Sequence, residues 1–199
     1  MWQQQQFDCI VVGGGPAGTT FAQVASRGGL SVLVLEKDRD IGMPVRCGEA
    51  ISDKGLRYFH DPDPRWIQST IDRIKLTAPK GTEIEFDLKD KGYILDRRIF
   101  DYDLAHMAAQ EGAMVVTKAY VNGLIIDNDM VCGVKGNYLN SPFEVKAKFV
   151  IGADGVESRV GRWGGLRTQV KLKDMESGIQ KTISGIEVQS NKFEFYLSR

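Results

Sequence analysis

The residues best suited to chemistry begin with a glycine-rich turn close to the N-terminus. Gly13, Gly15 and Gly18 have the spacing Gly-x-Gly-x-x-Gly. In this pattern the first glycine permits a tight turn, the second lets the backbone approach a pyrophosphate, and the third lets a helix pack close to a sheet. The start of that helix offers unpaired N–H groups and a partial positive charge to the anion. The spacing therefore predicts a dinucleotide-binding turn, and a tight turn without a ligand is the alternative.

Apolar strands on either side must hold this turn in place. Residues 7–12 and 30–35 are short apolar runs of the kind that parallel sheets bury. Between them, residues 17–27 have helical spacing, and Pro16 suits the first turn of a helix, where its missing N–H costs nothing. We therefore expect Pro16 and Ala17 to line the cofactor together with the glycines.

An acidic residue ends the second apolar run. Glu36 follows Gly18 at about the distance expected of a carboxylate that accepts the ribose hydroxyls of a dinucleotide. A carboxylate at this point would repel a 2′-phosphate, so the pattern favours FAD or NAD over NADP. Lys37, the next residue, is included among the predicted cofactor-binding residues.

A thiol occurs in the loop that follows. The glycines and proline of residues 37–48 exclude a helix, yet the segment carries several apolar residues and ends in Arg46, Cys47 and Gly48. A loop of this kind is expected to lie against another part of the molecule. From the residues alone, most lone cysteines are inert and buried, so a structural thiol is the competing interpretation of Cys47.

The remaining pattern is that of an α/β protein whose middle section has alternating, one-sided strands. Helical spacing covers residues 17–27, 52–59, 97–110 and about 156–162. Strand patterns cover residues 7–12, 30–35, 74–78, 84–88, 93–95, 113–116, 121–126, 130–135, 143–148, 149–151, 179–188 and 192–197. The strands between 121 and 148 are expected to form a β-meander.

Composition excludes several classes of protein. The 26 basic and 26 acidic residues cancel and are interspersed, so we expect no nucleic-acid partner. No apolar run approaches the roughly 20 residues that span a bilayer, and the N-terminus lacks the pattern of a signal peptide. The three cysteines have neither CxxC spacing nor a zinc-like grouping with the two histidines, so no metal site is expected. Cys9 and Cys132 fall in strand patterns and are expected to be buried thiols of a reduced, cytoplasmic protein.

Three separated stretches together resemble the FAD proteins typified by para-hydroxybenzoate hydroxylase. These are the glycine turn, the start of the helix at residues 96–101 (DRRIFD), and residues 152–159 (GADGVESR). The resemblance implies a Rossmann-like FAD-binding domain (GR2-type) with a β-meander, followed by the beginning of a mostly antiparallel substrate domain. It implies that residues 1–72 and 90–165 form the FAD-binding domain, with 73–89 and 166–199 in the substrate-domain sheet.

The same resemblance assigns further cofactor contacts. Arg97 is similar to the arginine that touches the diphosphate region of FAD, although Arg98 is adjacent and a solvent-facing pair is the alternative. Asp154 and Gly155 are expected to hold their turn close to FAD, with a local Asx-type turn as a competing or coexisting account. Arg46 is expected near the flavin or the diphosphate, and a surface arginine is the other interpretation.

The loop at residues 44–50 (PVRCGEA) resembles that of the geranylgeranyl reductase family, in which a Cys-Gly pair lies near the flavin. The family hydrogenates isolated C=C bonds in isoprenoid chains of lipids, chlorophyll or quinones. The resemblance implies FAD as cofactor, NAD(P)H or reduced ferredoxin as transient electron donor, an isoprenoid lipid substrate and peripheral membrane contact. It makes Cys47 the candidate catalytic proton donor, and shaping the pocket or forming a covalent adduct are its alternative roles.

The chain departs from this family in its length. Family members are roughly twice as long, and their later Gly-Asp and aromatic substrate-domain motifs have no counterpart here. We therefore expect an N-terminal half that is inactive alone and holds FAD weakly. An FAD-dependent aromatic monooxygenase and a non-catalytic FAD-binding fragment remain the alternative functions, while the Asp154 motif disfavours a simple NAD dehydrogenase. The oligomeric state is not predicted.

Overall fold

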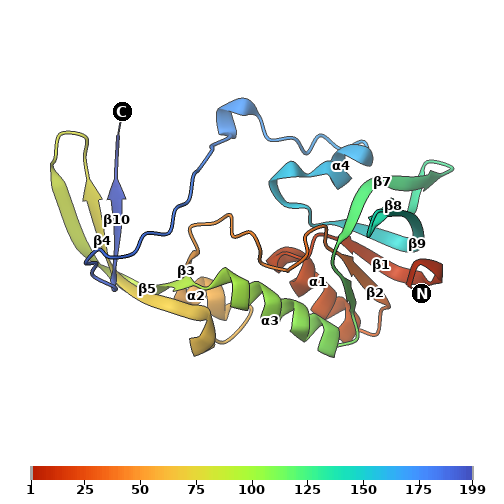
Figure 1. The fold of residues 1–199 in the computed structure, drawn as a ribbon, viewed down its shortest axis with the longest axis horizontal. Helices are drawn as coiled ribbons and strands as arrows, with labels where there is room; N and C mark the ends of the chain where they lie inside the picture. The colour runs from red at the N-terminus through yellow and green to blue at the C-terminus, as the bar shows by residue number, and fades with distance from the viewer. Residues whose placement is uncertain (1, 199) are drawn as a thin grey trace. The chain divides into compact units, whose positions relative to one another are not determined.

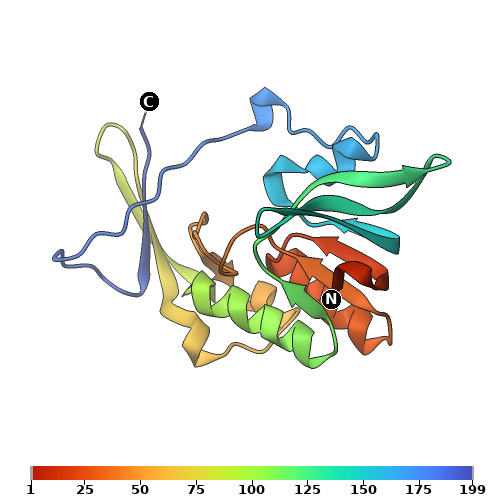
Figure 2. The same cartoon turned by 45° about the vertical axis from the view of Figure 1, so that its right-hand side comes forward.

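The computed structural model describes residues 2–198. The chain forms two compact units (Figures 1 and 2). Unit 1 comprises the residues up to Pro44 together with Asp101–Ser177, and unit 2 comprises Val45–Phe100 together with the residues from Gly178 onward. The two units are separated by how densely their residues contact one another, which does not identify a cofactor domain or a substrate domain. The predicted boundary between those two domains therefore stays a prediction.

Unit 1 is built on a six-stranded sheet in the order β6-β2-β1-β9-β8-β7. The first four of these strands are parallel, and β8 and β7 continue the sheet as antiparallel neighbours. The bounds are β1 Gln6–Val12, β2 Val32–Leu35, β6 Met114–Val116, β7 Ala119–Asp127, β8 Met130–Tyr138 and β9 Ser141–Gly152. The predicted meander is therefore confirmed, and its third strand runs on to become a parallel neighbour of β1.

The central strands β1 and β2 are buried on both faces. On one face, Cys9 and Val34 pack with Ala22 of helix α1 (Pro16–Arg27) and Ala108 of helix α3 (Arg97–Gln110). On the other face, Ile10, Val12, Leu33 and Leu35 pack with residues of the meander. Burial on both faces explains why these strands are continuous apolar runs in the sequence.

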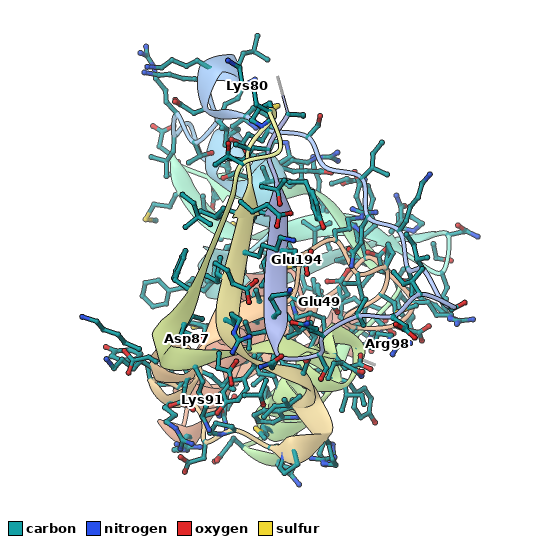
Figure 3. All side chains as sticks on the ribbon, turned by 90° about the vertical axis from the view of Figure 1, so that its left-hand side faces the viewer. Glu49, Lys80, Asp87, Lys91, Arg98 and Glu194 are labelled. Atoms are coloured by element: carbon teal, nitrogen blue, oxygen red, sulfur yellow. The ribbon has the colours of Figure 1, made fainter. Side chains whose placement is uncertain are left out.

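Unit 2 contains a four-stranded, mostly antiparallel sheet in the order β10-β4-β5-β3. Its strands are β3 Ala50–Ser52, β4 Ile67–Thr77, β5 Glu83–Leu95 and β10 Lys192–Tyr196, and only β10 and β4 are parallel. Alternation along the strands separates an apolar face from a charged one, as the period of two requires. On the charged face, Arg73 binds Asp87 and Glu85, and Lys75 binds Glu83. Figure 3 labels Asp87, Glu194 and other charged residues of this unit.

Short elements complete the two units. Helix α2 (Asp53–Arg57) lies within the predicted helical range 52–59, and Ser52 caps its start, since the Ser52 hydroxyl accepts the Gly55 N–H at 3.0 Å. Helix α4 is Arg159–Trp163. Four 3-10 turns cover Trp2–Gln4, Pro64–Trp66, Gly155–Glu157 and Leu172–Asp174.

Several predicted elements differ from the structure. The strands predicted at 84–88 and 93–95 are one strand, β5, and those at 143–148 and 149–151 are one strand, β9. The helix predicted at about 156–162 is divided at Ser158, whose φ of +40° interrupts helical geometry. The strand predicted at 179–188 is wrong, because this segment pairs with no strand among the described residues. Cys9 is buried, but Cys132 is only half-buried.

Asp8 of the central strand β1 links Ser31, the residue before β2, with Lys148 of β9. Its carboxylate accepts hydrogen bonds from the N–H and hydroxyl of Ser31 at 2.9 and 2.8 Å, and from the ammonium of Lys148 at 2.7 Å. The bond from Lys148, followed by those from Ser31, holds the pKa of Asp8 well below its usual range. A lowered pKa contributes stability that is complete above the unfolded-state pKa, about 3.9, and is lost as pH falls toward the folded-state value.

We therefore predict that Asp8→Asn lowers the melting temperature at pH 7 and flattens its acid dependence. The amide cannot pair with the Lys148 ammonium, so acidification from pH 6 to pH 3 should lower the Tm of the variant less than that of the wild type. Thermal unfolding monitored by circular dichroism measures both values. Parallel Tm curves for the two proteins across this pH range would contradict the assignment.

Candidate functional site

The glycine turn is packed backbone against backbone. A Cβ added at Gly18 would lie 2.1 Å from the carbonyl oxygen of Gly13, and one added at Gly13 would lie 2.3 Å from the carbonyl oxygen of Ala153. Gly13 also has a φ of +112°, which L side chains rarely adopt. By contrast, a Cβ at Gly15 would meet no atom within 4 Å. Two glycines thus make the close packing, and the third leaves open space at the start of α1.

The start of α1 is arranged to receive an anion. Gly15 is its N-cap residue and has no side chain to accept a helix N–H, and Pro16 follows at the first helical position. The first N–H groups of a helix have no partner within it, so those of Ala17 and Gly18 are available to a ligand. Ala17 is exposed, and Gly15 and Pro16 are half-buried.

Glu36 lies beside this turn with its carboxylate held by backbone groups. Its Oε2 accepts the Gly14 N–H and its Oε1 accepts the Asp38 N–H, both at 2.8 Å. Each carboxylate oxygen can accept a further hydrogen bond, so two acceptors remain for a ribose diol. The adjacent Lys37 is exposed, and its ammonium pairs with the Asp38 carboxylate.

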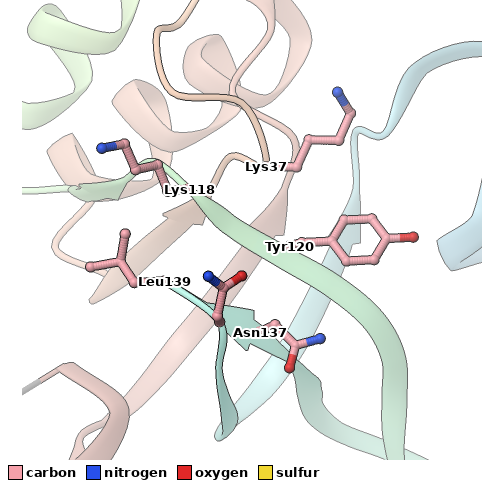
Figure 4. Close-up of a pocket in the computed structure, with 6 residues that line it drawn as sticks. Lys37, Lys118, Tyr120, Asn137 and Leu139 are labelled. Atoms are coloured by element: carbon pink, nitrogen blue, oxygen red, sulfur yellow. The ribbon is translucent and has the colours of Figure 1, made fainter.

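A cavity of about 600 Å³ opens next to Lys37 (Figure 4). Its lining residues come from the end of β2 and from β7, β8 and the turn after β8. They are Lys37, Lys118, Tyr120, Asn137, Leu139 and Asn140. The backbone carbonyl of Glu36 accepts the Ala119 N–H at 2.8 Å, so the start of β7 is tied directly to the end of β2.

The Asp154 segment reaches the glycine turn through the pairing of β9 with β1. Gly152 lies opposite Val12 in the register, which brings Ala153 against Gly13. The Asp154 carboxylate accepts the Val160 N–H of α4 at 2.9 Å. Gly155 is exposed and has a φ of +68°. The structure thus brings together the glycine turn, Glu36 and the Asp154 segment, all in unit 1.

The loop that carries the thiol belongs to unit 2. Cys47 is exposed, and its Sγ accepts the Glu49 N–H at 3.3 Å. It lines a cavity of about 590 Å³ together with Val45, Arg46, Gly48, Gly178, Ile179 and Gln180. The loop therefore does lie against another segment, the chain that begins at Gly178. Arg46 and Gly48 are both exposed.

The adjacent arginines at the start of α3 have different environments. Arg98 donates to the buried Asp96 carboxylate from Nε at 2.9 Å and from Nη2 at 2.5 Å. Gln68 also donates to this carboxylate, at 3.0 Å, and the bonds from Arg98 hold the pKa of Asp96 below its usual range. Arg97 is half-buried, and its backbone N–H donates to Glu49 Oε1 at 3.4 Å. Arg98 thus neutralises a buried carboxylate, and the cofactor contact of Arg97 stays a prediction.

The unit 1 residues fit a dinucleotide with an unphosphorylated ribose. The open space at Gly15 and the N–H groups of α1 suit a diphosphate, and the Glu36 carboxylate suits the ribose diol. Among residues 2–198, no group of three or more histidine, cysteine, aspartate or glutamate side chains could hold a metal ion. Along the same residues, no helix combines the length and the apolar character needed to cross a membrane.

Comparison with protein families agrees with this geometry. Residues 11–74 match the family described as NAD(P)-binding Rossmann-like domain. Residues 90–195, more than half of the chain, match the family described as FAD binding domain. The chain belongs to the FAD-binding domain family. Its Rossmann-like half, mixed sheets and meander are the expected α/β architecture of that family.

The chain is also similar in sequence to two archaeal reductases. It is 44% identical to the digeranylgeranylglycerophospholipid reductase of Methanocella arvoryzae over 98% of this chain and 50% of that protein. It is 40% identical to digeranylgeranylglycerophospholipid reductase 1 of Methanothermobacter thermautotrophicus over 96% of this chain and 50% of that protein. The chain thus spans about half the length of the curated relatives it matches.

Solved structures give the same architecture. A geranylgeranyl bacteriochlorophyll reductase-like protein from Thermoplasma acidophilum superimposes with a TM-score of 0.83 at 33% identity, over 97% of this chain and 50% of that one. A flavin-dependent brominase superimposes with a TM-score of 0.64 at 21% identity, over 80% of this chain and 41% of that one. At that identity the brominase supports the fold alone.

Sequence reasoning missed two residues that organise the site. Glu49 contacts both the Cys47 sulfur and the Arg97 N–H, and Asp96 accepts the guanidinium of Arg98. Asp96 could have been found, because an aspartate before a helix is a common cap. Glu49 lies within the PVRCGEA stretch, but the sequence does not indicate its role, because that role depends on a left-handed backbone corner at φ +63°.

The contrasting environments of Gly15 and Gly18 predict opposite effects of an added methyl group. Gly18→Ala should lower the free energy of unfolding by about 1–3 kcal/mol or more, because a backbone carbonyl has to move. Gly15→Ala should leave stability nearly unchanged, since its φ of −73° suits alanine. It should weaken FAD binding at least about tenfold, because the methyl group would occupy the approach to the diphosphate. Chemical unfolding and FAD titration measure the two effects, and unchanged FAD affinity in Gly15→Ala would refute the diphosphate site.

The two arginines provide a second matched pair. Arg98→Gln should lower stability by about 1–3 kcal/mol, because it leaves the Asp96 carboxylate buried with fewer partners. Arg97→Gln should instead weaken FAD binding. Thermal unfolding without FAD and fluorescence titration with FAD separate these effects. If Arg98→Gln weakened FAD binding and Arg97→Gln did not, the cofactor contact would have to be assigned to Arg98 and not to Arg97.

Proposed function

We propose that this chain is the cofactor-binding part of an FAD-dependent reductase that hydrogenates isolated C=C bonds in isoprenoid chains. The observation that carries the proposal is the exposed Cys47 thiol in a cavity that also contains Val45 and Ile179. A proton donor beside apolar side chains suits an alkene substrate better than a charged one. The names of the relatives, which share 38–44% identity with the chain, support the same class of reaction.

FAD binding is proposed to use the unit 1 residues in the following way. The N–H groups of Ala17 and Gly18 bind the diphosphate, with Gly13 and Pro16 shaping the turn. The Glu36 carboxylate accepts the ribose hydroxyls. The cavity beside Lys37 gives room for the adenine, and its tyrosine and asparagine side chains supply polar contacts. Asp154 and Gly155 fix the turn that presses on Gly13.

In unit 2, Arg97 is proposed to contact the diphosphate region, and the Arg46–Gly48 segment to serve the reacting end of the cofactor. When bound and reduced, FAD supplies the hydride that is added to one alkene carbon. The Cys47 Sγ holds the proton that the other alkene carbon receives. NAD(P)H or reduced ferredoxin is the proposed electron donor, and the long apolar substrate implies peripheral contact with a membrane.

The full-length protein is the right material for the decisive assay. Its flavin is reduced with dithionite without oxygen and then mixed with a geranylgeranyl lipid, while flavin reoxidation is followed spectrally. We expect reoxidation by the lipid and a saturated product by mass spectrometry. If the lipid did not reoxidise the flavin, and a phenol in a parallel cell were hydroxylated in the presence of oxygen, the protein would belong to the aromatic monooxygenases instead.

The thiol is tested in the same assay. Cys47→Ala should slow lipid reduction by about a hundredfold or more, the size expected of a lost general acid, while FAD stays bound. Cys132→Ala is the matched control, because Cys132 is half-buried on β8 in unit 1. A Cys47→Ala enzyme that reduces the lipid within about twofold of the wild-type rate would leave the thiol a structural role only.

A further inference from the structure

Glu49 occupies a backbone corner that residues with a Cβ rarely adopt. Its φ is +63°, in the left-handed region, and it stands between Gly48 and the first residue of β3. Such a conformation persists only where the surrounding contacts hold it in place. Its presence at a glutamate directly after the Cys-Gly pair therefore needs an explanation.

The contacts of Glu49 supply one. Its N–H donates to the Cys47 Sγ at 3.3 Å, and its carbonyl oxygen accepts the Leu95 N–H at 2.9 Å. Its side-chain Oε1 accepts the Arg97 N–H at 3.4 Å. One residue thus binds the sulfur on one side and the beginning of α3 on the other, and all four residues belong to unit 2.

The bond to the Cys47 sulfur and the bond from the Arg97 N–H each have a chemical consequence. A donor on the sulfur limits the rotamers of Cys47 and so fixes the direction in which the sulfur faces. A carboxylate at the start of a helix satisfies an N–H that lacks a partner and interacts favourably with the helix dipole. The Glu49 carboxylate also acts on the neighbouring Arg98, whose guanidinium pKa it helps to raise after the larger effect of Asp96 (Figure 3).

We propose that Glu49 is a positioning residue that sets the Cys47 sulfur and the start of α3, which carries Arg97, in one fixed arrangement. The proposal rests on the function proposed above, because it gives Cys47 and Arg97 their roles. Glu49 itself contacts neither substrate nor cofactor in this account. Its carboxylate acts as a hydrogen-bond acceptor, so an amide in the same position should replace it.

The test uses full-length protein and three variants of this residue. Glu49→Gln keeps the acceptor, whereas Glu49→Ala and Glu49→Gly remove it. Glycine also relieves the left-handed backbone, so Glu49→Gly remains informative if the alanine variant fails to fold. Asp61→Ala is the control, because it removes a carboxylate of the same unit whose side chain is 97% exposed.

Two readouts are compared with Tm. The first is the rate of iodoacetamide labelling at Cys47, followed by mass spectrometry with Cys9 and Cys132 as internal references. The second is the dissociation constant of FAD. We expect Glu49→Ala and Glu49→Gly to change the rate of Cys47 labelling at least about threefold, because the sulfur is no longer held in one rotamer, and to weaken FAD binding about fivefold. Glu49→Gln should restore both values to nearly those of the wild type.

Three results would overturn the proposal. One is wild-type labelling and FAD affinity in both Glu49→Ala and Glu49→Gly. Another is a change in only one readout, since Glu49 would then serve the thiol or the helix but would not link them. The third is a Glu49→Gln variant as impaired as Glu49→Ala. Neither readout requires lipid turnover, so failure here is distinguishable from failure of the reductase assay.

Discussion

The direct contact between the backbone of α1 and the backbone of the glycine turn is the constraint on which unit 1 depends. With no Cβ at Gly18, the helix approaches the Gly13 carbonyl, and with no Cβ at Gly13, the turn approaches the Ala153 carbonyl. Three segments far apart in the sequence therefore meet without intervening side chains. This contact layer brings the helix N-terminus, the end of β1 and the end of β9 to one place, and it leaves Gly15 as the glycine that faces open space.

Unit 2 is organised by side chains. The buried Asp96 carboxylate joins β4, through Gln68, to the start of α3, through Arg98, while the Asp96 N–H donates to the Trp66 carbonyl at 2.7 Å. A charge that is 4% exposed is tolerable only with several partners, and this one has a guanidinium, an amide and a backbone N–H. The same bonds engage Arg98, so its guanidinium has a structural role in unit 2.

The fold and the cofactor turn could be predicted from the sequence because their signals are local. A Gly-x-Gly-x-x-Gly turn between two buried strands, with an acid after the second strand, determines the local backbone conformation through residues that are close in the sequence. The segment at 179–188 misled the prediction because apolar alternation describes a strand without saying whether a partner strand exists. The break at Ser158 and the corner at Glu49 could not be predicted, because serine and glutamate do not favour a positive φ and the surrounding contacts have to hold them there.

The electrostatics around Glu36 follow from which groups hold it. Its two hydrogen-bond donors are the backbone N–H groups of Gly14 and Asp38, which are neutral and so do not offset the negative charge of a carboxylate. A lysine beside it could have offset this charge and accepted a 2′-phosphate, but the Lys37 ammonium is paired with Asp38. A 2′-phosphate would therefore meet an uncompensated carboxylate, whereas a free diol would meet two acceptors. This balance of charges favours FAD or NAD over NADP, because neither FAD nor NAD carries a 2′-phosphate on its adenosine ribose, and the match to the FAD-binding domain family then favours FAD.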